Sequence, residues 1–412
     1  MLTIALAACG SDGGKSADDA GGNAGVTGTA TGGSDGSTTL PAEAEIAPAG
    51  RAFYAGPSPL PRQKAGTLIW SAPIDAPAGA RAWKVLYHSR SLQNRDIVVS
   101  GVVVVPDGTK PAAGRPVLTW AHGTTGTADK CAPSKSASVA KELPDIDAFV
   151  RAGYVVTATD YEGLGTPGLH PYLVGASEGR GVLDIVRAAG QLSGAGISDD
   201  VVIFGHSQGG HAALWAGQIA PEYAPELHVQ GVVAAAPASD LTTLYGAASA
   251  LPAYMGYIVM AGQGFAAAYP DLDLGDILTP AAEKETKTAA ATLCQNEIDA
   301  QFGAGHAPIV TTSPLSVPEW AATIAENTPG AVATKAPTLV VQGGADPLVP
   351  PSLNRTYVQD HCADGGGGFE YHEYPGADHS GVMTASANDV QAWIGARFAG
   401  EDFVSDCTVP AG

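Results

Sequence analysis

Residues 201–210 read Val-Val-Ile-Phe-Gly-His-Ser-Gln-Gly-Gly, and this segment is the strongest indication of the fold. Its first four residues are β-branched or aromatic, which predicts a buried strand, and a helical pattern follows directly to about Ile219. Between them, Gly205–Gly209 match Gly-x-Ser-x-Gly, a sharp strand-to-helix turn that holds a serine in a strained backbone conformation. In this context the motif predicts that Ser207 is a nucleophile. A glycine-rich turn without chemistry is the less favoured interpretation.

From residue 67 onward, short β-rich runs alternate with helical stretches, which predicts a mostly parallel sheet covered by helices. Residues 81–88 and 96–105 are expected to open the sheet as an antiparallel pair. The expected later strands are 116–121, 154–159, 201–204, 229–235, 337–342 and 369–374. Further helices are expected near residues 139–151, 178–192, 352–361 and 386–399. A serine turn on such a sheet is the arrangement of the α/β-hydrolase fold.

The alternation stops in residues 240–330, which are rich in alanine and carry tyrosine and methionine at helical spacing. This segment is expected to be a helical cap inserted between two strands of a hydrolase domain that spans residues 51–412. An insertion at that point lies above the carboxyl ends of the strands, where α/β proteins bind their ligands. Four residues are candidates for lining a substrate channel, although packing inside the cap is an equally good interpretation. They are Tyr254, Tyr257, Ile258 and Phe265.

A serine hydroxyl needs a base that an acid orients, and in this fold the chain order is Ser, acid, His. Asp346 lies in a turn directly after the apolar strand at 337–342, where the fold places its acid. Three other late carboxylates are less well placed. Asp360 ends a helix, Asp364 lies in a glycine-rich loop, and Asp378 adjoins the expected base. We therefore expect Asp346 to be the acid.

Three histidines follow Asp346 in the chain. His361 is late in a helix and His372 is inside a strand, whereas His379 lies in the loop after that strand. The fold places its base in this loop, so we expect His379 to fill that role.

Two backbone N–H groups must face the oxyanion of the tetrahedral intermediate. One is expected from Gln208, directly after the nucleophile. The other is expected from the loop His122–Gly126, at Thr124 or, failing that, at Gly123, with a plain turn as the alternative interpretation of this loop.

Composition excludes some classes of function. The formal net charge is −20 and no block of Lys and Arg occurs, so a nucleic-acid partner is not expected. Beyond the first residues, no apolar run is long enough to span a bilayer.

The N-terminus predicts export. Leu6-Ala-Ala-Cys9 matches a bacterial lipobox, in which Cys9 would carry lipid and hold the protein at a membrane surface. No basic segment precedes it, which suggests a truncated signal or a late start; an ordinary Ala-rich N-terminus is the alternative. Residues 10–50 are rich in Gly, Ser, Thr and Ala, lack aromatic residues and are expected to be a flexible tether. The expected location is the cell envelope, as a lipoprotein, or the medium.

The remaining four cysteines agree with export, because an even number predicts two disulfides, with three possible pairings. They are Cys131, Cys294, Cys362 and Cys407. No CxxC motif occurs, so no zinc site is expected, and free buried thiols are the alternative.

Two further segments carry a family resemblance. Ala158–Tyr172 reads Ala-Thr-Asp-Tyr-Glu-Gly-Leu-Gly-Thr-Pro-Gly-Leu-His-Pro-Tyr, and Glu178–Arg187 reads Glu-Gly-Arg-Gly-Val-Leu-Asp-Ile-Val-Arg. Together with the serine turn, they resemble the secretory lipase family of Candida-type yeasts and its actinobacterial relatives, over about residues 60–407. The resemblance implies an α/β-hydrolase core with a helical cap, esterase or triacylglycerol lipase activity, and no cofactor.

Residue by residue, the resemblance supports Ser207, Asp346 and His379. It also implies that Cys131 pairs with Cys294 and Cys362 with Cys407. Two features depart from the family: the yeast enzymes are freely secreted and have no lipobox, and their oxyanion loop does not match His122–Gly126 closely.

The sequence thus predicts a serine ester hydrolase that acts through an acyl-serine intermediate, with acylglycerols as the expected substrates. Four alternatives stay open. An esterase for polyesters or aromatic esters, an acyltransferase and a peptidase would use the same catalytic residues. A catalytically inactive hydrolase fold that binds ligands at the cell surface would not use them.

Overall fold

The computed structural model describes residues 45–46, 53–248, 254–362 and 366–410. Cys9 and nearly all of the 10–50 segment lie outside the described residues. The strands described are β1 (Glu45–Ile46), β2 (Leu68–Ile74), β3 (Ala80–Arg90), β4 (Asp96–Pro106), β5 (Arg115–Ala121), β6 (Val155–Thr159), β7 (Ile197–His206), β8 (His228–Ala235), β9 (Thr338–Gly343) and β10 (Phe369–Tyr374).

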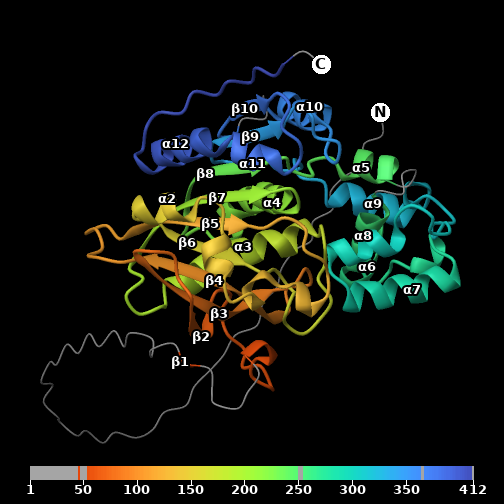
Figure 1. Cartoon of the computed structure of the whole chain (residues 1–412), viewed down its shortest axis with the longest axis horizontal. Helices are drawn as coiled ribbons and strands as arrows, with labels where there is room; N and C mark the ends of the chain where they lie inside the picture. The colour runs from red at the N-terminus through yellow and green to blue at the C-terminus, as the bar shows by residue number, and fades with distance from the viewer. Residues whose placement is uncertain (1–44, 47–52, 249–253, 363–365, 411–412) are drawn as a thin grey trace, which may run out of the picture. The chain divides into compact units, whose positions relative to one another are not determined.

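These strands form one sheet in the order β1-β2-β3-β4-β6-β5-β7-β8-β9-β10 (Figure 1). From β6 to β10 every neighbouring pair is parallel, whereas β3 is antiparallel to both β2 and β4, and β4 is antiparallel to β6. The expected antiparallel opening and the mostly parallel sheet are confirmed. The sequence did not single out β2, which contains Pro73, a residue that argues against a strand inside a sheet.

Both faces of the central strands are buried, which explains their continuous apolar runs. Alternate residues of β7 face opposite layers. Val201 and Ile203 pack with α3 (Gly175–Ala189) and α4 (Gln208–Tyr223), while Val202 and Phe204 pack with the opposite layer of helices. That layer consists of α1 (Val139–Glu142), α2 (Ile146–Arg151) and α12 (Ala387–Phe398). The sheet is therefore the middle of a three-layer core.

Two expected helices are shorter than predicted. The helix expected at 139–151 is divided between α1 and α2, because Pro144 lies between them and Asp145 adopts a positive φ of 51°. The last helix, expected at 386–399, is α12, and a separate short helix, α11 (Gly381–Ala385), precedes it. The other two expected helices are α3, which runs from Gly175 to Ala189 where 178–192 was expected, and α10 (Pro351–His361), which follows β9.

Between β8 and β9 the described residues form a group of cap helices with a core of its own. The helices are α5 (Leu241–Ala248), α6 (Met255–Ala268), α7 (Pro280–Thr292), α8 (Gln295–Phe302) and α9 (Pro318–Glu326). Figure 1 shows them gathered on one side of the sheet. Phe265, Phe302 and Trp320 are fully buried in this core, which also includes Tyr172 and Leu173 from the loop before α3.

A disulfide joins the cap to the main domain. The structure links Cys131, in the segment after β5, to Cys294, the residue before α8, with Cα atoms 5.5 Å apart. Gly126 lies against this link, and the Gln295 amide donates to the Thr125 carbonyl at 2.9 Å. The second disulfide joins Cys362 to Cys407. Both pairings are those that the family resemblance implies.

Candidate active site

Ser207 lies at the turn between β7 and α4, in a strained backbone conformation with φ 58° and ψ −118°. Its amide donates to the Ala235 carbonyl of β8 at 2.8 Å, which fixes the turn against the neighbouring strand. A Cβ atom on Gly205 would lie 2.0 Å from the Gly209 carbonyl oxygen. A Cβ atom on Gly209 would lie 1.8 Å from the Ala121 carbonyl oxygen. The turn therefore needs glycine on both sides of the serine.

The structure brings Asp346 and His379 together at the carboxyl ends of β9 and β10. The Nδ1 atom of His379 is 2.7 Å from Oδ2 of Asp346, and because a carboxylate accepts, Nδ1 donates. The other ring nitrogen, Nε2, is buried and has no hydrogen-bond partner among the described residues. A ring held in this tautomer leaves the Nε2 lone pair available to take a proton.

The Asp346 carboxylate is buried and well supplied with donors. Oδ1 accepts from the amides of Leu348 and Val349 at 2.8 and 2.9 Å. Burial acts to raise the pKa of Asp346, but the hydrogen bonds from His379 and the two amides outweigh it and hold the pKa below its ordinary value. Asp346 is therefore ionised at neutral pH and can stabilise a positive charge on His379.

A second histidine supports the loop that carries His379. The ring of His206 lies 4.8 Å from the ring of His379, and its Nε2 donates to the His379 carbonyl at 2.8 Å. Burial, together with the nearby His379, lowers the pKa of His206 to about 4. His206 is thus neutral at pH 7 and holds the His379 backbone in place.

The loop after β5 lies beside the serine, as the sequence predicts. A Cβ atom on Gly123 would be 3.7 Å from Cβ of Ser207, so this backbone runs directly alongside the serine turn. The Thr124 hydroxyl forms a 2.7 Å hydrogen bond with the Tyr172 hydroxyl, which ties the loop to the segment before α3. Gln208 follows Ser207 as the first residue of α4. These positions are compatible with the expected oxyanion donors.

A buried polar network, not recognised from the sequence, holds Gln208. Its Nε2 donates to Oε1 of Glu178 at 2.7 Å and to Nε2 of His170 at 2.8 Å. Burial lowers the pKa of His170 to about 4, so its ring is neutral and can accept this bond. Oε2 of Glu178 lies 3.0 Å from Nδ1 of His211, on the next turn of α4. The segments that carry the family resemblance thus hold the residue that follows Ser207 in place.

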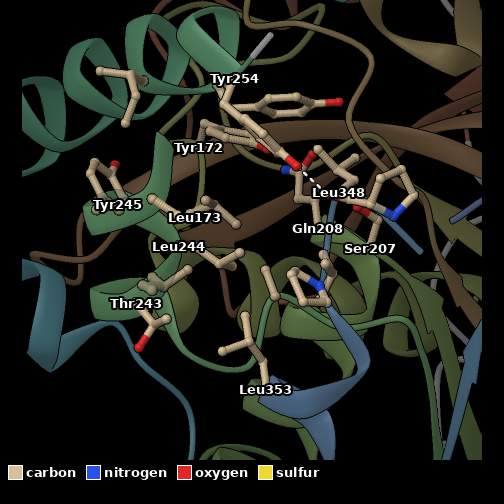
Figure 2. A pocket seen from close by; sticks show the side chains of 18 of the residues that line it. Tyr172, Leu173, Ser207, Gln208, Thr243, Leu244, Tyr245, Tyr254, Leu348 and Leu353 are labelled. Atoms are coloured by element: carbon tan, nitrogen blue, oxygen red, sulfur yellow. Dashed lines mark hydrogen bonds between the residues drawn. The ribbon is translucent and has the colours of Figure 1, made fainter. Parts of the chain in front are cut away.

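An apolar cavity of about 390 Å³ ends at Ser207 (Figure 2). Its wall comes from the cap, from the segment before α3, and from the residues between β9 and α10. The lining residues are Tyr172, Leu173, Ser207, Gln208, Ala238, Leu241, Thr243, Leu244, Tyr245, Ala247, Tyr254, Tyr257, Ile258, Pro347, Leu348, Val349, Pro350, Ser352 and Leu353. None of these has a charged side chain. Figure 2 shows Ser207 and Gln208 on one side of the cavity and Thr243 and Tyr245 on the other.

Three of the four cap candidates line this cavity: Tyr254, Tyr257 and Ile258. The Tyr254 hydroxyl also donates to the Pro347 carbonyl, which links the cap to the turn that carries Asp346. Phe265 does not line the cavity. It is fully buried behind it, with its ring 6.0 Å from that of Tyr245, so packing within the cap is the interpretation that fits Phe265.

In the described part of the chain, no group of three or more His, Cys, Asp or Glu side chains is arranged to hold a metal ion. None of the described helices combines the length and apolar character that crossing a membrane requires.

Comparisons with known proteins agree with this architecture. Lipase 6 of Candida albicans is 26% identical over 398 residues, covering 86% of this chain and 82% of that protein. A Mycobacterium tuberculosis protein named "Probable inactive lipase" is 25% identical over 384 residues, covering 86% of this chain and 83% of that protein. The crystal structure of Candida antarctica lipase A in its closed state superposes with a TM-score of 0.73 at 22% identity, covering 88% of this chain and 89% of that one.

A second solved structure, a rice cell wall degrading esterase from Xanthomonas oryzae, superposes with a TM-score of 0.66 at 18% identity, covering 82% of this chain and all of that one (100%). At these identities the two structures show the α/β-hydrolase fold alone. The profile of the secretory lipase family matches residues 130–406, which include the serine turn, the cap and the Asp346–His379 pair. The chain therefore belongs to the secretory lipase family, a family of ester hydrolases.

Proposed function

We propose that this protein hydrolyses carboxylic esters with an aliphatic acyl group, acylglycerols among them, and that Ser207 is its nucleophile. The observation that carries the proposal is the uncharged cavity of about 390 Å³ that ends at Ser207. A serine on a strained turn and a histidine already oriented by a carboxylate are the groups that acyl transfer requires.

The reaction has two halves. Oγ of Ser207 attacks the ester carbonyl carbon while Nε2 of His379 takes the hydroxyl proton, giving a tetrahedral oxyanion. The carbonyl re-forms and the C–O bond to the alcohol breaks as His379 returns the proton to the leaving alkoxide. Water then attacks the acyl-serine in the same way and releases the carboxylic acid. Asp346 stabilises the imidazolium, and the amides of Gln208 and Thr124 (or Gly123) stabilise the oxyanion.

The cavity wall favours an acyl chain as the group it holds. Leu241, Leu244, Ile258 and Leu353 present only aliphatic carbon to a ligand, and each CH₂ buried there contributes about 0.8 kcal/mol. A ten-carbon chain gains several kcal/mol over acetate, part of which can be expressed in the transition state as faster turnover. We therefore expect kcat/KM to rise from acetate to medium-chain esters.

Leu244→Asn tests this assignment, because asparagine has nearly the shape of leucine but places a polar group in the apolar wall. We expect kcat/KM for a ten-carbon nitrophenyl ester to fall about tenfold, while acetate hydrolysis changes less than twofold. Phe265→Leu is the matched control, since Phe265 lies outside the cavity. It should lower the melting temperature and leave the ratio of the two rates unchanged.

An equal loss on both esters in Leu244→Asn would show that Leu244 is structural packing only. No change on either ester would place the acyl group elsewhere. A higher rate on aromatic or polyester substrates than on any aliphatic ester would favour the esterase alternative.

One relative is named an inactive lipase, which keeps a binding role as the second candidate. The geometry here weighs against that role, because the serine turn, the Asp346–His379 pair and an Nε2 atom of His379 without a hydrogen-bond partner among the described residues are all present. Hydrolysis of emulsified tributyrin by the wild type, with none by Ser207→Ala, would exclude the binding role.

We further propose that the protein is exported and anchored by lipid on Cys9. The support is the lipobox Leu6–Cys9, the aromatic-free segment that follows it, and the disulfides of the folded domain. In a bacterial host, with a basic signal segment placed before Met1, the wild type should fractionate with membranes. Cys9→Ala should be released or remain an unprocessed precursor. If the wild type and Cys9→Ala were mature proteins of the same size and attached to membranes equally, the lipid anchor would be contradicted.

A further inference from the structure

A row of three buried polar side chains leads to the Asp346 carboxylate from the side opposite to the solvent. Ser239 follows β8, Asn354 lies on α10 and Gln342 lies on β9. Their exposed fractions are 1%, 0% and 0%. The Ser239 hydroxyl is 2.5 Å from Oδ1 of Asn354, Nδ2 of Asn354 is 2.6 Å from Oε1 of Gln342, and Nε2 of Gln342 is 3.1 Å from Oδ2 of Asp346.

The surroundings of Gln342 fix the direction of every bond in this row. Nε2 faces three oxygen acceptors, each at 3.1 Å: the carbonyls of Gly343 and Val349, and Oδ2 of Asp346. Only an amino group satisfies that site, so the amide oxygen of Gln342 must face Asn354. Asn354 then donates to it, and Ser239 donates to Asn354. All three bonds point their donors toward the carboxylate.

Oδ2 of Asp346 therefore accepts two hydrogen bonds, one from His379 and one from Gln342. The two donors compete for the negative charge on a single oxygen. A stronger bond from Gln342 leaves less charge to stabilise an imidazolium on His379, and donation from Ser239 through Asn354 strengthens the Gln342 bond by polarisation.

We propose that Gln342, held by Asn354 and Ser239, is a positioning residue that sets the basicity of Asp346 and, through it, the pH range in which His379 acts as a base. The inference rests on the proposed function. It adds three residues to the machinery, none of which touches the substrate's reacting atoms.

Other ionisable groups face Asp346 and His379, and their influence on the pH profile must be separated from that of Gln342. They are His206 on β7, whose ring is neutral above about pH 5 because its pKa is about 4, and Tyr257 on α6, whose pKa burial raises to about 12. Asp378 adjoins His379 in the chain, and its Oδ1 accepts from the Gly381 amide instead. None of these groups contacts the row from Ser239 to Gln342 in the described structure, so substitutions in the row leave them in place.

The experiment is the pH profile of kcat/KM on nitrophenyl butyrate for the full chain and three variants. In Gln342→Met, which keeps an unbranched side chain but loses the donor, the acidic limb should move up by about half a pH unit. The direction follows from the loss of a competing donor. The Asp346 carboxylate becomes more basic and the His379 imidazolium persists to higher pH, so kcat/KM rises only at higher pH. Asn354→Leu and Ser239→Ala should shift the limb in the same direction by progressively smaller amounts.

Thr338→Val is the matched control, because Thr338 is a buried polar residue on the same strand and its hydroxyl contacts only the Ala336 carbonyl. It should lower stability without moving the profile. If Gln342→Met does not fold, the acidic limb of Ser239→Ala tests the inference instead, because this variant removes only one hydroxyl at the far end of the row.

Variants that lose kcat with an unmoved acidic limb would show a merely structural row and overturn the inference. A shift toward lower pH would overturn it as well. Wild-type turnover that survives Ser207→Ala would instead contradict the proposed function, so the two failures are distinguishable.

Discussion

Ser207→Ala and His379→Ala are each expected to lower kcat on nitrophenyl esters by about 10⁴-fold or more, and by similar amounts. The reason is that a nucleophile and its base act as one unit, so losing either removes nearly the whole effect. The double variant should be no slower than either single variant. Initial rates of purified, folded proteins, with melting temperatures measured in parallel, provide the test.

His372→Ala is the matched control for the base. His372 lies on β10, and its Nε2 atom is 2.7 Å from a Glu370 carboxylate oxygen. The variant should keep near-wild-type turnover. If His379→Ala stayed active while His372→Ala lost activity, the assignment of the base would be wrong.

Removing the disulfide between Cys131 and Cys294 is expected to have the largest effect on stability. The bridge spans 163 residues, and closing a loop of that length stabilises a chain by roughly 2–5 kcal/mol on the chain-entropy estimate. Replacing both cysteines by serine should lower the free energy of unfolding by that amount, measured by urea denaturation. Limited proteolysis should cut the cap helices first, because the bridge ties α8 to the segment after β5.

The second disulfide supplies the comparison. Cys362 and Cys407 lie 45 residues apart, and both are outside the cap. Replacing them should also lower the free energy of unfolding, but the cap should stay resistant to protease. Equal sensitivity of the cap in both double variants would contradict a specific tie between the cap and the domain.

The residues around Ser207 were predictable because the signal is local. Ten consecutive residues contain the end of a buried strand, a turn that needs glycine on both sides of the serine, and the start of a helix. The pairing of Asp346 with His379 was predictable because each residue follows a strand that the sequence indicates clearly. Pro144 divides the helix expected at 139–151. Because proline strongly destabilises a helix interior, this break could have been predicted from the sequence.

Other parts of the site depend on tertiary contacts that no local pattern records. Helix α6 is apolar on most of its surface, so spacing alone could not tell that Ile258 faces the cavity and Phe265 faces the cap core. Glu178 and Gln342 are polar residues in buried elements. Glu178 bonds to Gln208, 30 residues away, and Gln342 is held by Asn354, 12 residues away, so only the folded chain shows that both support the site.

Reaction of the full chain with a fluorophosphonate, followed by peptide mass spectrometry to locate the adduct, tests directly whether Ser207 is the nucleophile of an ester hydrolase. We expect one phosphonylated residue, Ser207, at one equivalent per chain, with loss of esterase activity in proportion and no labelling of His379→Ala on the same timescale. An adduct on another serine, or full activity in a protein that carries the adduct at Ser207, would contradict this assignment.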